Sequence, residues 1–365
     1  MKRITCYMGS LASGGAEHQM CILSNMLVEK GYSVTIPTYL SERPDHYYLD
    51  PRIVREKIAP GKKNFIRVLS LMFHVLTVKT DVVISWGPMQ SVFILTALLF
   101  RPSIKAICGE RNYTGDNPSI WEKILYNTGL YRRAKYIIPN SYTQAEYEKK
   151  AHPSYSKMID TITNYTNLNE YKATPIPSND PIRIGIFCRM ERQKNFVRFI
   201  DALNIIRKKT DVAFKIDWYG NHTFTNPVQV SYFEEGLSKI NQFGLGDCIT
   251  LHDRVTNVSE LIPTFDVMCL PSLFEGFSNS ISEYICCGRP VICSDVSDNH
   301  VMVHDGENGL LFDPNNVDSI VSAFLKYFAL SNEQRIEMGL ASRKIAEGLF
   351  SEGRFINAYI KLIES

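Results

Sequence analysis

Two glutamates stand eight positions apart in the segment LFEGFSNSISEYICCGRP, which covers residues 273–290. On one straight helix, Glu275 and Glu283 would point about 80° apart and lie two turns from each other. The polar run from Ser278 to Ser280 instead favours a helix start between them, with Glu275 in the preceding loop. Carboxylates accept hydrogen bonds from vicinal hydroxyls, and the free amides of a helix start attract phosphate. The segment therefore predicts a sugar or ribose clamp beside a phosphate site. The alternative is a capped helix without a ligand, since the helix dipole also favours acidic residues near a helix N-terminus.

A second segment, FCRMERQKN at residues 187–195, places two cations at the end of a predicted strand. The guanidinium of Arg189 and the ammonium of Lys194 would hold a diphosphate from two sides, so that no metal ion is needed. Arg192 belongs to the same basic run, but this interpretation does not assign it to the diphosphate. A solvated basic loop without a ligand is the alternative.

A third segment, GSLASGGAEHQ at residues 9–19, leaves the first predicted strand and opens a helix at Gly14 and Gly15. Glycines let a phosphate or sugar approach the free amides of the helix start closely. The spacing is neither a Walker A motif nor Gly-x-Gly-x-x-Gly, and a Gly-Gly helix entry is also common in ordinary packing.

The loops after the third and fourth predicted strands, WGPMQS and CGERNYTGDNP, also carry polar side chains. In them, Glu110, Arg111 and Asn112 are candidates for orienting a second substrate. A structural ion pair explains Glu110 and Arg111 equally well.

The elements that must position these residues alternate between short β-branched or aromatic runs and longer helical patterns, which is typical of parallel sheets with crossover helices. The first half has helix starts near Gly14, Phe65, Pro88, Trp121 and Thr143. The predicted strands are residues 3–8, 33–39, 81–86, 104–110 and 134–140 in the first half, and 182–189, 213–220, 248–253, 266–272, 290–295 and 308–313 in the second.

Between the two halves, residues 166–181 are rich in Asn, Pro and Ser and are predicted to be a linker. We therefore expect an N-terminal domain at residues 1–170 and a C-terminal domain at 181–345, facing each other across a cleft. Residues 346–365 are predicted to be a helix that packs back on the N-terminal domain. Ligands of open α/β sheets bind beyond the carboxyl ends of the strands, where all the candidate residues lie.

The composition of the chain argues against a nucleic-acid-binding surface, a cysteine zinc site and a membrane-spanning segment. The 365 residues carry a formal net charge of only +2, which argues against a surface dedicated to nucleic acid. The nine cysteines form no paired Cys-x-x-Cys zinc pattern and lie mostly in apolar runs, so reduced thiols and a cytoplasmic location are expected. No apolar stretch is long enough to cross a membrane.

One segment suggests a membrane surface. Residues 61–79, GKKNFIRVLSLMFHVLTVK, combine a basic start with an apolar helical face that would rest on an anionic membrane. Peripheral contact with the cytoplasmic face of the inner membrane is therefore one prediction. The alternative is a helix packed on the sheet with a solvated lysine end.

In their order and spacing, four segments resemble the retaining glycosyltransferases of family 4 (glycosyl transferases group 1), and particularly enzymes that build bacterial surface polysaccharides. The likeness covers nearly the whole chain and is strongest over residues 182–315. The segments are SLASGGAEHQ, CRMERQKN, EGFSNSISE, and GRPVICSD followed by HDGENGLLFDPNN. The resemblance implies the GT-B architecture, in which two Rossmann-like domains, each with a doubly wound parallel sheet, face each other across a cleft.

The resemblance also implies roles for individual residues. Glu275 would lie near the donor sugar and Glu283 on the nucleotide ribose, while Arg189 and Lys194 would hold the donor diphosphate in place of a metal. Arg189, Lys194 and Glu275 are thus the predicted catalytic residues. The predicted donor-binding residues are Gly14, Gly15, Gly276, Phe277, Ser278, Asn279 and Glu283.

Two departures from the family pattern concern the same sites. Arg111 stands where the family often has a histidine, and His18 and His74 are interpreted as ordinary helix residues. The usual proline of the two-glutamate element is absent. A UDP-sugar is the expected donor, with GDP- and ADP-sugars as alternatives.

The expected reaction is therefore transfer of a hexose or N-acetylhexosamine to a glycan or a polyprenyl-diphosphate-linked glycan, without a metal cofactor. An epimerase- or phosphorylase-type enzyme of the same architecture and a non-catalytic nucleotide-sugar-binding protein are the alternatives. A nicotinamide-dependent oxidoreductase is disfavoured, because no Gly-x-Gly-x-x-Gly follows the first strand with an acid about 20 residues later.

Overall fold

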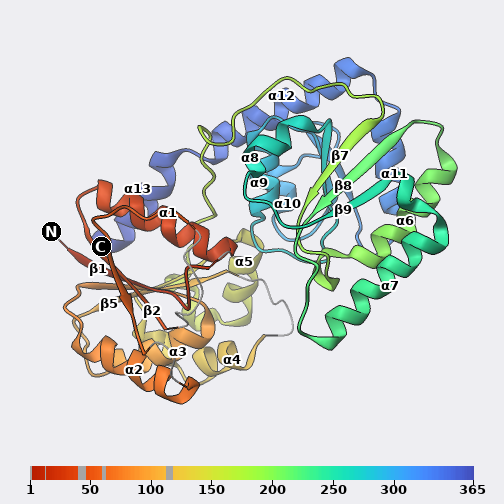
Figure 1. The fold of residues 1–365 in the computed structure, drawn as a ribbon. Coiled ribbons are helices and arrows are strands. Elements are labelled where there is room, and N and C mark those ends of the chain that lie inside the picture. Colours follow the sequence, from red (N-terminus) through yellow and green to blue (C-terminus); the bar gives the residue numbers. More distant parts are fainter. Residues whose placement is uncertain (1, 13, 40–46, 60–62, 112–117) are drawn as a thin grey trace. The chain divides into compact units, whose positions relative to one another are not determined.

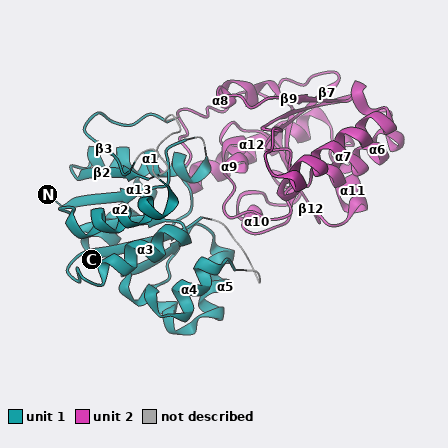
Figure 2. Ribbon diagram, turned by 60° about the horizontal axis from the view of Figure 1, so that its bottom comes forward, with its two compact units in different colours: residues 1–165, 352–365 teal, residues 166–351 magenta. Residues whose placement is uncertain are grey.

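The computed structural model describes residues 2–12, 14–39, 47–59, 63–111 and 118–365. The chain divides into two compact units (Figures 1 and 2). Unit 1 comprises residues 1–165 and 352–365, and unit 2 comprises residues 166–351. Each unit has one six-stranded parallel sheet covered by helices, as the alternating sequence pattern predicts.

Unit 1 has the strand order β3-β2-β1-β4-β5-β6, in which neighbouring strands are all parallel. Its strands are β1 (Arg3–Tyr7), β2 (Ser33–Thr38), β3 (Val54–Lys57), β4 (Val82–Trp86), β5 (Lys105–Glu110) and β6 (Tyr136–Pro139). Its helices are α1 (Gly15–Glu29), α2 (Asn64–Thr77), α3 (Pro88–Leu98), α4 (Ile120–Asn127), α5 (Tyr142–Ala151) and α13 (Glu352–Glu364).

Unit 2 repeats this topology, with the strand order β12-β11-β10-β7-β8-β9. Its strands are β7 (Ile182–Phe187), β8 (Phe214–Tyr219), β9 (Ile249–His252), β10 (Val267–Leu270), β11 (Val291–Ser294) and β12 (Gly309–Phe312). Its helices are α6 (Phe196–Lys209), α7 (Pro227–Phe243), α8 (Val258–Leu261), α9 (Asn279–Cys286), α10 (Asn299–Met302), α11 (Val317–Phe328) and α12 (Asn332–Leu349). In both units the chain reverses its direction of strand addition beside the first strand, and such a switch point forms a crevice for ligands.

Strand β3 is the one strand of the described chain that the sequence analysis missed. Its sequence, VREK, has no apolar run, and its two end residues, Val54 and Lys57, are exposed. β3 pairs only with β2 at the sheet edge. Backbone pairing rather than burial therefore defines this strand, and a hydrophobic pattern cannot reveal it.

The predicted linker, residues 166–181, belongs to unit 2, and two arginine side chains bind its backbone. The buried guanidinium of Arg289 donates to the carbonyl oxygens of Thr174 (2.9 Å), Pro175 (3.1 Å) and Pro263 (3.0 Å). Arg343 adds a bond of 3.1 Å to the carbonyl of Tyr171. These carbonyls have no regular ladder partner, so the buried arginine supplies the hydrogen bonds that they need.

The C-terminal end returns to unit 1 at Glu352, whereas the sequence analysis placed this return at residue 346. Helix α13 buries Phe355, Ile356, Tyr359, Leu362 and Ile363. Lys2 and Lys105 donate to the carbonyl of Ile363 at 2.9 and 2.8 Å.

Replacing Arg289 with Met should strongly destabilise unit 2, because the carbonyl groups of Thr174, Pro175 and Pro263 lose the buried guanidinium that donates to all of them. We expect a loss of about 3 kcal/mol or more in urea unfolding followed by circular dichroism. Arg207→Met is the matched control, since Arg207 forms only an exposed ion pair with Asp247 and should contribute little. Equal unfolding midpoints for the two variants would contradict this role.

Candidate functional site

The second-half candidate residues gather at the switch point of unit 2. β7 and β10 are neighbours there, and Arg189 and Lys194 follow β7 while Glu275 follows β10. Gly220 lets the chain after β8 pass close to this point, because a Cβ atom on it would lie 2.0 Å from the carbonyl oxygen of Cys188. The switch point thus brings together both predicted cations and one predicted carboxylate.

Lys194 and Glu275 form a buried ion pair between Nζ and Oε1. Their side chains are 13% and 10% exposed, so water screens the two charges weakly. Burial lowers the pKa of Lys194, but attraction to Glu275 and Cys188 outweighs it, and the net pKa is raised. The ammonium therefore stays charged in this setting.

Hydrogen bonds to backbone groups hold the two loops of this ion pair together. Leu273 donates its amide to the carbonyl of Gln193 at 2.8 Å, and the Gln193 side chain donates to the carbonyl of Phe274 at 3.1 Å. The Ser297 hydroxyl donates to the Glu275 carbonyl at 2.6 Å and accepts from the Glu275 amide at 3.3 Å. Both loops are therefore fixed before any ligand arrives.

Arg189 is an accessible cation of this loop. Its guanidinium lies 2.7 Å from the buried carboxylate of Glu191, yet the Arg189 side chain is 56% exposed. Its charge is close enough to Lys194 to lower the pKa of that ammonium, against the larger effect of Glu275. Arg192 is also exposed, in the short 3₁₀ helix Arg192–Lys194.

Helix α9 begins where the sequence predicted. Ser278 is its N-cap, and the Ser278 hydroxyl accepts from the amide of Ile281 at 3.3 Å. The helix is tied to the end of β7, because Ser280 donates to the Phe187 carbonyl and the Phe187 amide donates to Tyr284, both at 2.9 Å. The free amides of α9 consequently lie at the same strand end as Arg189 and Lys194.

Glu283 lies in the second turn of α9 and is only partly exposed. Burial raises the pKa of Glu283 to about 8, with a hydrogen bond from Tyr171 lowering it and the charge of Glu170 raising it further. The same contact and burial raise the pKa of the Tyr171 hydroxyl. Glu283 is thus a carboxyl group whose pKa is raised toward neutral pH, with the Tyr171 hydroxyl as its hydrogen-bond donor.

The remaining donor-side residues divide between the units. Gly276 precedes Phe277, which is buried with its ring against Phe350, and Asn279 opens α9. Gly14 and Gly15 lie in unit 1, where Gly14 caps α1. A Cβ atom on Gly14 would lie 2.1 Å from a carboxylate oxygen of Glu17. Glu17 therefore places a negative charge at the helix start that the sequence analysis assigned to phosphate.

The acceptor-side candidates are engaged inside unit 1. Glu110 is buried and accepts from Tyr131 at 2.5 Å and from Gln144 at 3.0 Å. Burial, together with the nearby charge of Glu148, raises the pKa of Glu110 well above its usual value. Arg111 stacks over Trp86 and donates to Tyr359 at 2.7 Å. Asn112 lies outside the described residues.

Several residues that brace the site were missed by sequence reasoning. Gln193, Ser280, Ser297 and Tyr284 act through hydrogen bonds to backbone groups, which any polar side chain can form. Tyr171 stands in the predicted linker, 112 positions from Glu283 in sequence. Only the Asn- and Pro-rich composition around Tyr171 was visible, and it predicts no partner.

This geometry agrees with the comparison to known families. A family model described as glycosyl transferases group 1 matches residues 181–329, which include the ion pair, the α9 start and Glu283. Residues 181–329 belong to the glycosyl transferases group 1 family. The chain is accordingly a glycosyltransferase.

Two curated relatives of this glycosyltransferase are bacterial. The chain is 24% identical over 340 residues to the N-acetylgalactosamine-N,N'-diacetylbacillosaminyl-diphospho-undecaprenol 4-alpha-N-acetylgalactosaminyltransferase of Campylobacter jejuni, covering 88% of each chain. It is 37% identical over 174 residues to the O-antigen chain mannosyltransferase B of Escherichia coli, covering 47% of this chain and 43% of the relative.

A solved structure extends the likeness to the whole fold. HepE from Anabaena, in complex with UDP and glucose, superposes with a TM-score of 0.80 at 16% identity, covering 100% of both chains. This glycosyltransferase therefore has the GT-B architecture that its sequence predicted.

The pKa of Glu283 predicts a pH dependence of stability. Its folded-state pKa of about 8 lies above the ordinary value of 4.5, so the folded chain holds a proton that the unfolded chain releases. The contribution of Glu283 to stability should therefore fall as the pH rises from about 5 to 8. Thermal unfolding across that range should show a smaller decline for Glu283→Gln than for the unchanged chain. Parallel curves would contradict the raised pKa.

Proposed function

We propose that this glycosyltransferase is a retaining enzyme of family 4 that transfers a hexose or N-acetylhexosamine from a UDP-sugar. The acceptor is a glycan or a polyprenyl-diphosphate-linked glycan in bacterial polysaccharide biosynthesis. One observation carries the proposal: the buried Lys194–Glu275 pair, accessible Arg189 and the start of α9 meet at the ends of the neighbouring strands β7 and β10.

The comparisons support the substrate classes. A diphospho-undecaprenol acceptor appears in the name of the Campylobacter relative, and O-antigen in the name of the Escherichia relative. UDP and glucose are the ligands of the HepE complex. Both substrate classes are compatible with a site built from cations, carboxylates and a helix start.

The cations would act on the leaving group. Breaking the bond from the anomeric carbon to the diphosphate builds negative charge on the leaving oxygen. Arg189 and Lys194 would balance that charge from one side and the amides at the start of α9 from the other. Because Gln193 and Ser297 already fix these loops, little reorganisation would accompany bond cleavage.

The carboxylates would orient the two ends of the donor. Glu275 would accept from hydroxyls of the transferred sugar, while Lys194 keeps its buried charge compensated. Glu283 would accept from the ribose hydroxyls, and its raised pKa means that ribose binding would draw a proton off this group near neutral pH. The acceptor hydroxyl would attack the anomeric carbon from the same face that the diphosphate leaves, so the anomeric configuration would be retained. The departing diphosphate would take the proton of that hydroxyl.

Arg189→Met should lower kcat/KM for sugar transfer by about 10²- to 10³-fold, by analogy with the loss of one hydrogen-bond donor at a developing oxyanion. Arg192→Met is the matched control, because Arg192 is another exposed arginine of the same loop, and it should retain most of the activity. Thermal stabilisation by UDP and UDP-sugars should first identify the donor.

The same assay separates the alternatives. UDP-sugar turnover without any acceptor would favour an epimerase- or phosphorylase-type enzyme, and UDP binding without turnover would favour a binding protein. Equal activity of the two arginine variants would remove Arg189 from the catalytic set.

The anomeric configuration of the product tests the stereochemical part. We expect ¹H NMR of the first-formed product to show the same anomeric configuration as the donor sugar. An inverted product would exclude attack from the face of the leaving group, while leaving the sugar transfer itself intact.

A further inference from the structure

Ser297 has an unusual backbone conformation in the loop between β11 and α10. Its φ of +49° lies in the left-handed region. The amide of Asn299 donates to the carbonyl of Val296 at 3.0 Å, so Ser297 is the second residue of a tight turn. Turns with positive φ at that position are dominated by Gly, Asn and Asp, and a serine there is strained.

The Ser297 hydroxyl makes two hydrogen bonds to the backbone of Glu275. It donates to the Glu275 carbonyl at 2.6 Å and accepts from the Glu275 amide at 3.3 Å. Glu275 lies between β10 and α9, outside the helices and strands, so neither a helix nor a sheet ladder holds these two groups. The hydroxyl therefore fixes the backbone from which the Glu275 carboxylate projects.

The same backbone conformation occurs at the other member of the ion pair. Asn195 directly follows Lys194, and its φ is +59°. The Asn195 side chain donates to the carbonyl of Pro314 at 2.8 Å. In the described part of the chain, two of the four non-glycine residues with positive φ thus adjoin the Lys194–Glu275 pair. Such residues persist where surrounding contacts enforce them, and they are frequent at active sites.

Glycine is the residue that the backbone at position 297 favours. It would adopt this φ without strain, but it would lose both hydrogen bonds to Glu275. The serine therefore serves the Glu275 loop rather than its own turn.

We propose that Ser297 is a positioning residue for Glu275, whose hydroxyl fixes the Glu275 backbone so that the carboxylate faces the transferred sugar. This inference rests on the proposed function, in which Glu275 accepts from hydroxyls of that sugar. Ser297 acts through Glu275 and not through the nucleotide. Its loss therefore weakens the binding of a UDP-sugar and leaves the binding of UDP, which has no transferred sugar, almost unchanged.

The first test removes the hydroxyl and the strain together. Ser297→Gly should lower kcat for sugar transfer by about 10- to 100-fold, because a displaced catalytic group costs rate steeply. Its thermal unfolding midpoint should nevertheless be at or above that of Ser297→Ala, which lacks the hydroxyl but keeps the strain. Activity and stability should therefore not change in parallel.

Ser178→Gly is the matched control for this variant. Ser178 is an exposed serine of unit 2 with a φ of +57°, so the same substitution relieves the same kind of strain. It should keep the kcat of the unchanged chain and should not lower its unfolding midpoint.

The second test measures binding by calorimetry without an acceptor. The ligands are UDP, UDP-glucose, UDP-galactose and the N-acetyl forms of these two UDP-sugars. Ser297→Ala should bind UDP within about 2-fold of the unchanged chain, and the tightest-binding UDP-sugar about 10-fold more weakly.

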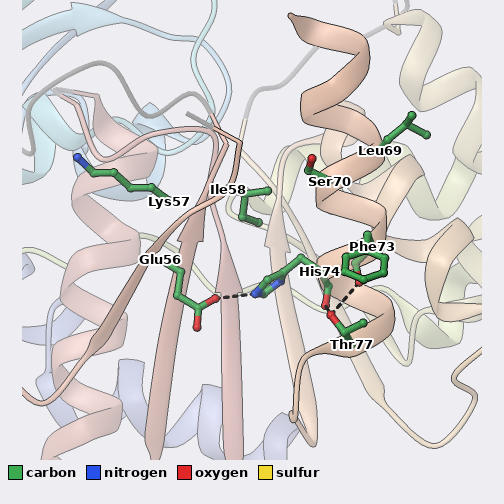
Figure 3. Close-up of a pocket in the computed structure, with 8 residues that line it drawn as sticks. All are labelled: Glu56, Lys57, Ile58, Leu69, Ser70, Phe73, His74 and Thr77. Atoms are coloured by element: carbon green, nitrogen blue, oxygen red, sulfur yellow. Dashed lines mark hydrogen bonds and ion pairs between the residues drawn. The ribbon is translucent and has the colours of Figure 1, made fainter. Parts of the chain in front are cut away.

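Ser70→Ala is the control for the binding measurement. Ser70 is half-buried like Ser297, but it lines an open groove of about 680 Å³ between β3 and α2 of unit 1 (Figure 3). Figure 3 also shows that Glu56, the acid of this groove, is bound to His74, at 2.6 Å. Because the donor residues after β7 and β10 belong to unit 2, Ser70→Ala should change neither affinity.

Ser297→Gly with the kcat and the UDP-sugar affinity of Ser178→Gly would overturn the proposal. An equal weakening of UDP and UDP-sugar binding would also overturn it, because Ser297 would then only support the fold. The calorimetry requires no turnover. A chain that binds UDP-sugars but transfers no sugar would contradict the proposed function, while the binding comparison would still decide the role of Ser297.

Discussion

A buried ammonium and a buried carboxylate compensate each other at the switch point of unit 2, and the rest of the candidate site is arranged around them. Neither Lys194 nor Glu275 would tolerate that burial alone, because an unpaired charge in a poorly screened place is costly. Their pairing requires the loop after β7 and the loop after β10 to lie side by side, which the adjacency of those two strands ensures. The hydrogen bonds of the Gln193 carbonyl to the Leu273 amide and of the Ser297 hydroxyl to the Glu275 carbonyl then hold the loops at the distance that the pair needs.

The other polar groups of the two units differ in the hydrogen bonds and ion pairs that they already form within the protein. Arg189 is paired with Glu191 but remains open to solvent, so an incoming anion can reach it. Glu283 accepts a hydrogen bond from the Tyr171 hydroxyl, and burial raises its pKa to about 8. Glu110 and Arg111 contrast with both, because their hydrogen bonds run to buried groups within unit 1. A substrate can bind polar groups that are accessible and that still have hydrogen-bonding capacity to offer.

The two units have the same strand order but use it differently. In unit 2 the loops after the paired strands β7 and β10 hold the charged constellation. In unit 1 the helix start after the first strand, at Gly14, has the Glu17 carboxylate against it. The groove of unit 1 lies instead at the sheet edge, where the short strand β3 and the amphipathic helix α2 leave apolar side chains uncovered. A common topology thus provides positions for a site, and the side chains at those positions decide which chemistry is available.

The sequence by itself determined the alternation of strands and helices, the start of α9 at Ser278 and the placement of the charged residues after strands. Those features depend on local hydrophobic patterns and capping, which are written in consecutive residues. Only the tertiary structure decided that Lys194 pairs with Glu275, that Tyr171 reaches Glu283 from a segment resembling a linker, and that VREK is a strand. These features depend on contacts between residues far apart in the chain, or on backbone pairing at a sheet edge. No local pattern records such partners, because many different side chains could form the same hydrogen bonds.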